Sequence, residues 1–172
     1  MQRQEHWFSA GDLAHWNQAV PRYTSYPTVP QWGPISAEAI QRALRQTREP
    51  AQVYVHVPFC REQCRYCGCN MVVARRQEAG DRFLQVLAEY VQALTLPRQR
   101  VKVQRVHLGG GTPTWLNEAQ LDRLCDVITS RFDVVESGEW SIEADPSTVD
   151  RNRIAHIASL GFKRISFGVQ SL

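Results

Sequence analysis

Four of the chain's five cysteines lie in one short segment, at Cys60, Cys64, Cys67 and Cys69. Cysteine thiolates are soft ligands that bind zinc and iron–sulfur clusters. The amino-terminal residues MQRQEHWFSA have neither the apolar core nor the cleavage site of a secretory signal, so a reducing compartment is expected. In that setting the segment indicates metal binding rather than disulfides. The fifth cysteine, Cys125, lies on the apolar stripe of a predicted helix and is expected in the core.

The spacing of the thiols separates two kinds of metal centre. Structural zinc takes four ligands in paired short spacings, so Cys69 would need a distant Cys or His as its partner, and Cys67-Gly-Cys69 is tighter than the usual zinc knuckles. A 4Fe-4S cluster with one open iron needs three thiolates, which Cys60-x3-Cys64-x2-Cys67 supplies. An open iron binds a further ligand and can act as a catalyst. We therefore expect a 4Fe-4S cluster held by these three cysteines, with zinc as the alternative.

The rest of the chain alternates between strand and helix patterns. Strands are predicted at 52–57, 101–108, 140–144 and 163–168, and helices at about 36–45, 81–94, 117–128 and 154–161. Asn117 and Gln120 form a capping box, and Gly161 is a left-handed helix stop. Ile154, Ile157 and Ala158 mark the buried face of the last helix. Strand–helix repetition of this length implies an α/β fold with a parallel sheet.

The unusual residues follow the carboxyl ends of the predicted strands, one motif after each strand. They are the cysteine segment, the triplet Gly109–Gly111, Glu143 with Asp145-Pro146, and Val169-Gln170. That edge of an α/β sheet or barrel is where ligands bind. Glycines allow the backbone to approach a ligand closely. A carboxylate at Glu143, on the face opposite Trp140 and Ile142, is costly to bury without a partner. The sequence therefore predicts one shared site at this edge.

Composition narrows the class of protein. The chain is 43% apolar and 22% charged, which excludes collagen-like, coiled-coil and disordered classes. The net charge of +3 comes from interspersed residues with no basic arm, so no nucleic-acid partner is expected. No apolar run approaches the roughly 18 residues of a membrane span. We expect a cytoplasmic protein.

Two regions are expected along the chain: residues 1–50, an irregular arm followed by a helix, and residues 51–172, the core domain. The prolines of Pro21-Arg-Tyr-Thr-Ser-Tyr-Pro-Thr28 exclude a regular helix there. Its aromatic residues indicate that the arm packs against another surface.

These motifs together resemble a known family. Cys60-x3-Cys64-x-Tyr66-Cys67 resembles the signature of the radical S-adenosylmethionine (SAM) enzymes. The stretch from Tyr54 to Asn70 is similar, more specifically, to the oxygen-independent coproporphyrinogen III oxidases. Four further segments carry the same resemblance: residues 21–28, 109–114, 141–146 and 167–170.

The resemblance implies an incomplete parallel (β/α) barrel of the radical SAM type, with four of roughly six strands present. The fourth strand would leave an unpaired apolar edge, so we expect the chain to be the N-terminal part of a longer enzyme. The implied reaction is the anaerobic oxidative decarboxylation of coproporphyrinogen III to protoporphyrinogen IX in haem biosynthesis. A 5′-deoxyadenosyl radical made from SAM at the cluster takes a hydrogen from each propionate that becomes a vinyl group. An electron donor such as a flavodoxin or ferredoxin and a monomeric state are expected.

The resemblance also assigns site residues. The cluster ligands are Cys60, Cys64 and Cys67, and two SAM molecules are expected. The first SAM contacts Tyr54 and Gly110, and Glu143 meets a SAM hydroxyl or ammonium. The contacts assigned to the second SAM are Tyr66, Gly111, Thr112 and Gln170. Cys69 is an active-site residue of open role, with a small buried hydrophobe as its alternative, and His56 is expected to be a satisfied strand histidine.

Other functions remain as alternatives. A haem-binding chaperone of the same superfamily, which is not an enzyme, is the first. Those relatives generally lack a cysteine at the position of Cys69 and the arm at residues 21–28, both of which this chain has. A radical enzyme that modifies RNA would show a basic stripe or an added RNA-binding domain, and neither is visible. A zinc-stapled interaction domain is the third alternative.

Overall fold

The computed structural model describes residues 9, 11–12, 15, 28–65 and 67–169. Contacts divide the chain into two units, residues 1–36 and 37–172. The first unit includes the 3-10 helix η1 (Val29–Gln31). The second begins with helix α2 (Ala37–Arg45), where a helix was predicted at about residues 36–45. The expected domain boundary between residues 50 and 51 stays a prediction.

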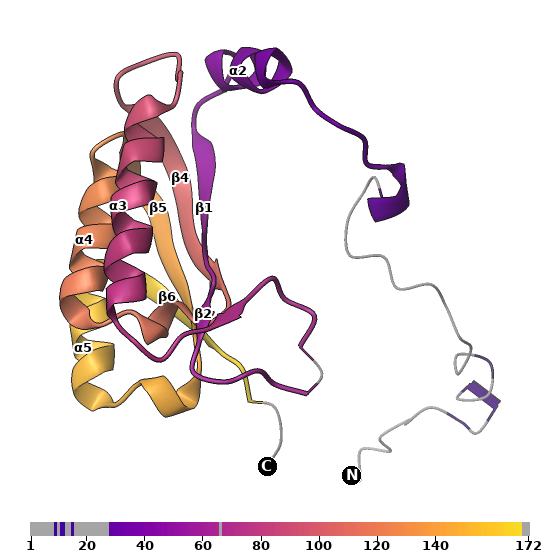
Figure 1. Ribbon diagram of the computed structural model, residues 1–172, viewed down its shortest axis with the longest axis vertical. Coiled ribbons are helices and arrows are strands. Elements are labelled where there is room, and N and C mark those ends of the chain that lie inside the picture. The colour runs from indigo at the N-terminus through magenta and orange to yellow at the C-terminus, as the bar shows by residue number, and fades with distance from the viewer. Residues whose placement is uncertain (1–8, 10, 13–14, 16–27, 66, 170–172) are drawn as a thin grey trace, which may run out of the picture. The chain divides into compact units, whose positions relative to one another are not determined.

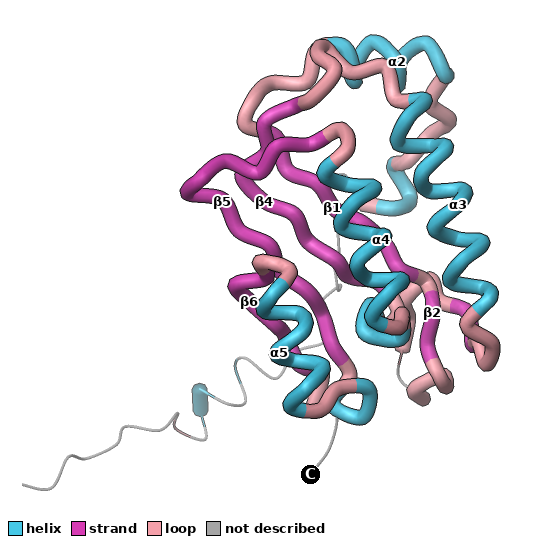
Figure 2. Tube along the Cα trace, turned by 90° about the vertical axis from the view of Figure 1, so that its left-hand side faces the viewer, coloured by secondary structure: helices cyan, strands magenta, loops and turns pink. Residues whose placement is uncertain are grey.

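Four parallel strands form the main sheet of the second unit. They are β1 (Ala51–Val57), β4 (Val101–Gly110), β5 (Phe132–Ala144) and β6 (Phe162–Phe167), in the order β1-β4-β5-β6. Helices α3 (Glu78–Ala93), α4 (Glu118–Thr129) and α5 (Arg151–Ser159) connect them and lie on one side of the sheet (Figures 1 and 2). Within the described residues the sheet stays open, because β1 and β6 each have one neighbour. This confirms the α/β class and the incomplete parallel barrel.

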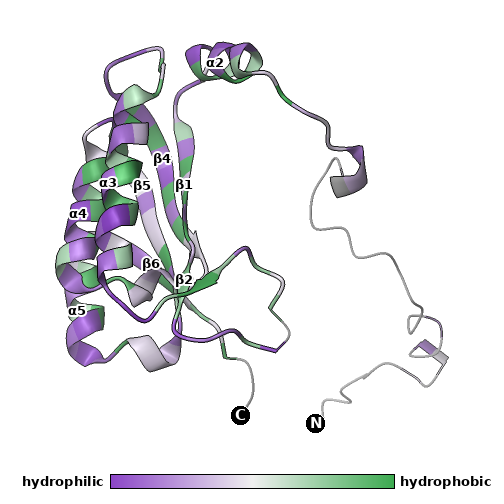
Figure 3. Ribbon diagram, in the orientation of Figure 1, coloured by the Kyte–Doolittle hydropathy of each residue, from purple (hydrophilic) through white to green (hydrophobic). Residues whose placement is uncertain are grey.

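The hydrophobic core fills the space between the sheet and the three helices. Side chains alternate between the two faces of a strand, so Val55 and Val57 of β1 enter this core whereas Tyr54 and His56 face the other side. Figure 3 shows hydrophobic residues along β1 and β4 and on parts of α3 and α4. The most deeply buried members come from every layer: Leu84, Leu108, Leu121, Ile142 and Ile157. Among the described residues of the second unit, no helix covers the opposite face of the sheet, which carries polar side chains.

Two local predictions are confirmed in detail. Asn117 Oδ1 accepts a hydrogen bond from the Gln120 N–H at 2.9 Å, and Gln120 Oε1 accepts from the Asn117 N–H at 3.2 Å, which is the capping box. Gly161 has φ +91°, the left-handed conformation of a helix stop. No described helix has the length and apolar character needed to cross a membrane.

Three predicted boundaries were wrong, because tertiary contacts extend these elements. Helix α3 begins at Glu78, before the predicted Asp81, because Gln120 of α4 donates to the Gln77 carbonyl at 2.8 Å and holds the first turn. Strand β5 begins at Phe132 instead of residue 140, because its first half also pairs with β4. Strand β4 continues through Gly110, beyond the predicted end at residue 108, because β1 pairs with it that far.

The buried face of α5 also differs from the prediction. Ile157 is fully buried, but Ile154 is 40% exposed and Ala158 is exposed too. Arg153 is buried in their place and donates a hydrogen bond to the Leu116 carbonyl. Arginine is rarely buried unless it is paired, so apolar periodicity alone misplaces this face.

Cys125 lies in the core as predicted, 8% exposed on α4. Burial, aided by the charges of Asp122 and Asp126, raises the pKa of this thiol to about 12. A cysteine in an unfolded chain has a pKa of about 8.5. Between these values the unfolded state loses the proton while the folded state keeps it, so stability should fall as the pH rises.

We therefore expect Cys125 to lower the free energy of unfolding by up to about 1.4 kcal/mol per pH unit above pH ~8.5. Denaturant titrations of the wild type and of Cys125→Ala, across that pH range, measure the effect. The alanine variant should show a shallower decline. Equal slopes for the two proteins would contradict the prediction.

Candidate active site

Three of the four predicted motifs meet at one edge of the sheet. The cysteine segment follows β1, the glycine triplet ends β4, and Glu143 lies near the end of β5. The strands are parallel, so these ends share the lower edge in Figure 1. Val169 follows β6 at the same edge, while Gln170 and Tyr66 lie outside the described residues. The juxtaposition read from the sequence is therefore present, and the roles of the individual residues stay predictions.

A short parallel ribbon, which the sequence analysis missed, closes the cysteine loop. It pairs β2 (Phe59–Cys60) with β3 (Val72–Val73). The Val72 N–H donates to the Pro58 carbonyl at 2.7 Å, and the Ala74 N–H donates to the Cys60 carbonyl at 3.0 Å. Both ends of the loop are thereby fixed beside β1. Two-residue strands have no periodicity, so only the β-branched pair Val72-Val73 hinted at this ribbon.

The thiols lie in different surroundings within the loop. Cys60 is half-buried, and its Sγ lies 3.3 Å from the Thr112 hydroxyl. Cys67 is also half-buried; its N–H donates to the Cys64 carbonyl at 3.0 Å, and its Sγ accepts from the Cys69 N–H at 3.4 Å. Cys64 and Cys69 are exposed, which contradicts the alternative of Cys69 as a buried hydrophobe.

Each of two thiols, Cys60 and Cys69, has a pKa that is raised in part by neighbouring cysteines. Burial raises the pKa of Cys60, and the nearby Cys67 and Cys64 raise it further, against a lowering by the Thr112 hydrogen bond. The hydrogen bond with Cys67, followed by burial, raises the pKa of Cys69. Among the described side chains, no three His, Cys, Asp or Glu residues form a group that could hold a metal ion. The donors present, three thiols on one loop with a backbone N–H directed at one sulfur, are of the kind that can hold an iron–sulfur cluster.

The glycine triplet packs directly against the start of this loop. The Gly111 N–H donates to the Val57 carbonyl, and the Thr112 N–H to the Phe59 carbonyl, both at 2.8 Å. A Cβ at Gly111 would lie 2.8 Å from the Phe59 carbonyl oxygen and 2.9 Å from Cys60 Sγ. Side-chain atoms do not fit at such distances, so the approach requires glycine. Gly111 therefore brings the end of β4 against the first predicted cluster ligand.

Pro113 and Trp115 pack beside the cysteine loop. They belong to the 3-10 helix η2 (Pro113–Trp115), and both are buried. The indole N–H of Trp115 donates to the Ala74 carbonyl at 3.0 Å. Thr112, just before this turn, is buried as well. The turn therefore contacts the end of the cysteine loop and helps to hold it in place.

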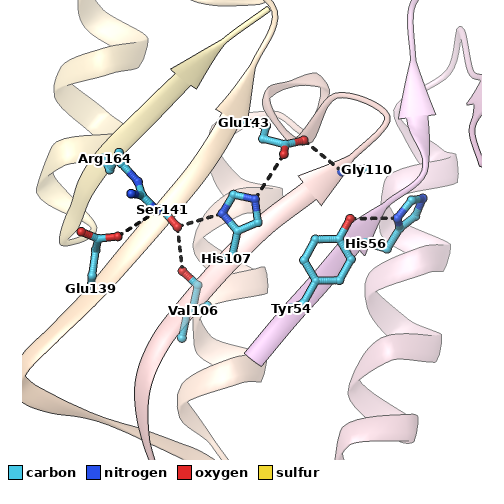
Figure 4. Close-up of polar contacts among 9 residues, drawn as sticks. All are labelled: Tyr54, His56, Val106, His107, Gly110, Glu139, Ser141, Glu143 and Arg164. Carbon is cyan, nitrogen blue, oxygen red and sulfur yellow. Dashed lines mark hydrogen bonds and ion pairs between the residues drawn. The ribbon is translucent and has the colours of Figure 1, made fainter. Parts of the chain in front are cut away.

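Polar residues cross the helix-free face of the sheet in a row. Register pairs Tyr54 of β1 with His107 of β4, and His107 with Ser141 of β5. His107 Nδ1 lies 2.8 Å from Ser141 Oγ, and its Nε2 lies 3.2 Å from Glu143 Oε1 (Figure 4). The Gly110 N–H donates to the other carboxylate oxygen of Glu143 at 3.3 Å. Glu143 thus has its partners within the protein.

His107 is the residue that the sequence analysis missed. Its signal was the strand period: His107 alternates with the buried Val106 and Leu108, so it must face the same side as the other polar residues. A single polar residue between two apolar neighbours is a common strand pattern, however, and Glu143 is distant in sequence. Only the pairing of β4 with β5 brings the two side chains together.

Tyr54 and His56 connect the sheet to the cysteine loop. His56 Nε2 donates to the Asn70 carbonyl at 2.7 Å, which leaves Nδ1 to accept from the Tyr54 hydroxyl at 3.1 Å. His56 is therefore a satisfied strand histidine, as predicted. Burial and the charges of Glu143 and Cys69 raise the pKa of Tyr54. The electrostatic influence of Glu143 accordingly extends to β1.

Comparisons with known proteins agree with this geometry. Residues 54–172 match the family model of the radical SAM superfamily. The structure aligns with that of coproporphyrinogen III oxidase from Escherichia coli, described as a radical SAM enzyme, with a TM-score of 0.78 and 37% identity over 87% of this chain and 35% of that chain. The chain therefore belongs to the radical SAM superfamily.

Its curated relatives define a narrower group. The oxygen-independent coproporphyrinogen III oxidase of Escherichia coli (strain K12) is 40% identical over 161 residues, which are 92% of this chain and 35% of that protein. The one from Mannheimia haemolytica is 38% identical over 136 residues, or 78% of this chain and 93% of that protein. Within the superfamily, the chain is a member of the oxygen-independent coproporphyrinogen III oxidase family. It spans about a third of the Escherichia coli relative.

Proposed function

We propose that this chain binds a 4Fe-4S cluster and SAM and serves the oxygen-independent oxidation of coproporphyrinogen III to protoporphyrinogen IX. The observation that carries the proposal is the contact of the glycine triplet with the cysteine loop, where Gly111 lies against Cys60 Sγ. The same edge of the sheet holds Glu143, two residues of β1 and the loop itself. The names of the relatives at 37–40% identity supply the reaction.

Cys60, Cys64 and Cys67 would hold the cluster. When bound, it supplies an electron for the reductive cleavage of SAM, and a cofactor of this kind carries the difficult chemistry while the protein positions it and excludes water. Cys69 follows the ligands and donates its N–H to Cys67 Sγ, so it would influence the electronics of the cluster through that bond. The side chain of Cys69 has no assigned step in this proposal.

The SAM contacts are proposed on the same edge. Tyr54 and Gly110 would meet the first SAM, Gly111 and Thr112 the second, and Glu143 a SAM hydroxyl or ammonium. Tyr66 and Gln170, outside the described residues, are assigned to the second SAM as well. Glu143 supports this proposal best, because its side chain is 46% exposed despite its partners and keeps lone pairs for a hydroxyl or an ammonium group.

The remaining partners follow from the chemistry of the substrate. Coproporphyrinogen III carries four carboxylates, which a chain with 20 Lys and Arg residues against 17 Asp and Glu suits electrostatically. An external electron donor such as a flavodoxin or ferredoxin would reduce the cluster. A monomer in the cytoplasm is the state we propose.

Anaerobic reconstitution of the chain with iron and sulfide tests the cofactor half of the proposal. Analysis of iron, sulfide and zinc should give about four irons and four sulfides per chain and no stoichiometric zinc. Reduced samples should convert SAM to 5′-deoxyadenosine. Stoichiometric zinc without sulfide would overturn the proposal in favour of the zinc-stapled alternative.

A chimera tests the substrate half. Here residues 1–172 replace the matching third of the Escherichia coli relative, and the protein is assayed anaerobically with coproporphyrinogen III, SAM and reductant. Formation of protoporphyrinogen IX with release of carbon dioxide is expected. A chimera that holds its cluster and cleaves SAM but leaves the porphyrinogen unchanged would contradict this substrate.

A further inference from the structure

His107 occupies the centre of the polar row on the helix-free face of the sheet. Tyr54 stacks against one side of its ring, with centroids 5.8 Å apart and planes inclined by 24°. On the other side, its two ring nitrogens form hydrogen bonds with Ser141 and Glu143 of the neighbouring strand (Figure 4). The side chain is 31% exposed, so it is held by neighbours and still reached by solvent. A ring with three such contacts has a single orientation.

The hydrogen-bonding partners of His107 determine that the nitrogen next to Glu143 is protonated. A carboxylate oxygen only accepts, so Nε2 donates to Glu143 Oε1 across 3.2 Å. Ser141 Oγ lies 2.8 Å from Nδ1 and 3.3 Å from the Val106 carbonyl oxygen. The serine hydroxyl gives its single hydrogen either to Nδ1 or to that carbonyl. In both arrangements Nε2 keeps its hydrogen and points it at the carboxylate.

The carboxylate of Glu143 is held at both oxygens. His107 donates to Oε1, and the Gly110 N–H donates to Oε2 at 3.3 Å. Gly109 allows this arrangement, since a Cβ there would lie 3.1 Å from the Glu143 carboxyl carbon and 3.0 Å from the Tyr54 ring. Of the two donors, the backbone N–H belongs to a strand and is fixed in any variant. His107 is therefore the only one of these two donors whose replacement would leave the carboxylate freer to rotate.

We infer that His107 is a positioning residue that holds the Glu143 carboxylate in the orientation in which it accepts from SAM. The inference rests on the proposed function, in which Glu143 meets a SAM hydroxyl or ammonium. His107 acts through Nε2 alone, and Ser141 on the far side of the ring sets the orientation from which Nε2 reaches the carboxylate. A preorganised acceptor binds its ligand more tightly because less freedom is lost on binding.

Two amide substitutions of His107 distinguish the role of Nε2 from that of Nδ1. The amide NH2 of glutamine reaches the position of Nε2, whereas that of asparagine reaches the position of Nδ1. His107→Gln should therefore keep the hydrogen bond to Glu143, and His107→Asn should keep only the one to Ser141. The measurement is the Kd for SAM on the reconstituted, cluster-loaded chain, with iron and sulfide contents determined on the same samples.

The expected result is that His107→Asn raises the Kd about 10-fold or more, the loss of one hydrogen bond to a charged group, while His107→Gln stays within about threefold of the wild type. Iron content should match the wild type in both. In a Glu143→Gln background the two variants should bind SAM equally, because the group that distinguishes them is gone. A folding defect of either variant persists in this background, so unequal SAM binding there would show a structural effect of residue 107 and overturn the inference.

Each outcome has one meaning. If the wild type holds a cluster and binds SAM but both variants bind it equally well, or weaken equally, His107 does not position Glu143 and the inference fails alone. A loss of iron in His107→Asn would show a structural role and would also overturn it. A wild-type chain that binds no cluster or no SAM overturns the proposed function, and the inference with it.

Discussion

Replacing Cys60 with serine should abolish the iron–sulfur cluster. Iron in the reconstituted chain should fall from about four per chain to near zero, and the brown absorbance and the cleavage of SAM should disappear with it. Among the proposed ligands, Cys60 is fixed by the most contacts, since it ends β2 and its Sγ lies against Gly111 and Thr112. A serine hydroxyl in this place keeps the shape and the contact with Thr112 but lacks the soft, readily ionised sulfur that the cluster needs.

Two other cysteines provide matched controls. Cys69→Ser changes an exposed thiol in the same loop, and it should keep its iron because the backbone N–H that donates to Cys67 Sγ remains. Cys125→Ala removes a buried thiol from the core and should keep its iron as well. Loss of the cluster in Cys69→Ser would mean that the ligand set was miscounted. An intact cluster in Cys60→Ser would show that Cys60 is not a ligand.

The sequence predicted the strand ends better than the helix faces. Motifs at the carboxyl ends of strands are contiguous in sequence, so the edge at which they lie follows once the strands are assigned, even where the exact boundary is off by two residues, as for Gly109–Gly111 at the end of β4. The inward face of α5 depended instead on Arg153, whose hydrogen bond to the Leu116 carbonyl joins residues far apart in the chain. Local periodicity carries no information about such a contact, so Ile154 was assigned to the core and lies outside it.

The candidate site shows the same division. Its thiols and glycines were located by their places in the sequence. The partner of Glu143 was expected to be a bound SAM molecule, whereas the structure pairs the carboxylate with His107. Both views of Glu143 are compatible, because one oxygen of a carboxylate can accept from several donors and the side chain is 46% exposed. What the sequence lacked was the register between β4 and β5, which sets His107 beside Ser141. Register is decided by the packing of whole strands.

Replacing Gly111 with alanine should damage the proposed cluster site without replacing any of its ligands. The new Cβ would lie 2.8 Å from the Phe59 carbonyl oxygen and 2.9 Å from Cys60 Sγ. The first of these atoms is backbone within the β2–β3 ribbon and cannot rotate away, so either β2 or the end of β4 must shift. Overpacking of this kind costs about 1–3 kcal/mol. We expect the free energy of unfolding to fall by that amount and most of the reconstituted iron to be lost.

Gly68→Ala is the control for this prediction, because it makes the same chemical change inside the cysteine loop. No atom lies within 4 Å of a Cβ at Gly68, and its φ is not positive. Iron content and stability should therefore stay near those of the wild type. Denaturant titration and iron analysis of both variants measure the difference. If Gly111→Ala keeps the iron content of the wild type, the close approach of β4 to Cys60 does not shape the site. If Gly68→Ala loses as much iron as Gly111→Ala, the loss does not depend on the close contacts at Gly111, and the prediction is refuted.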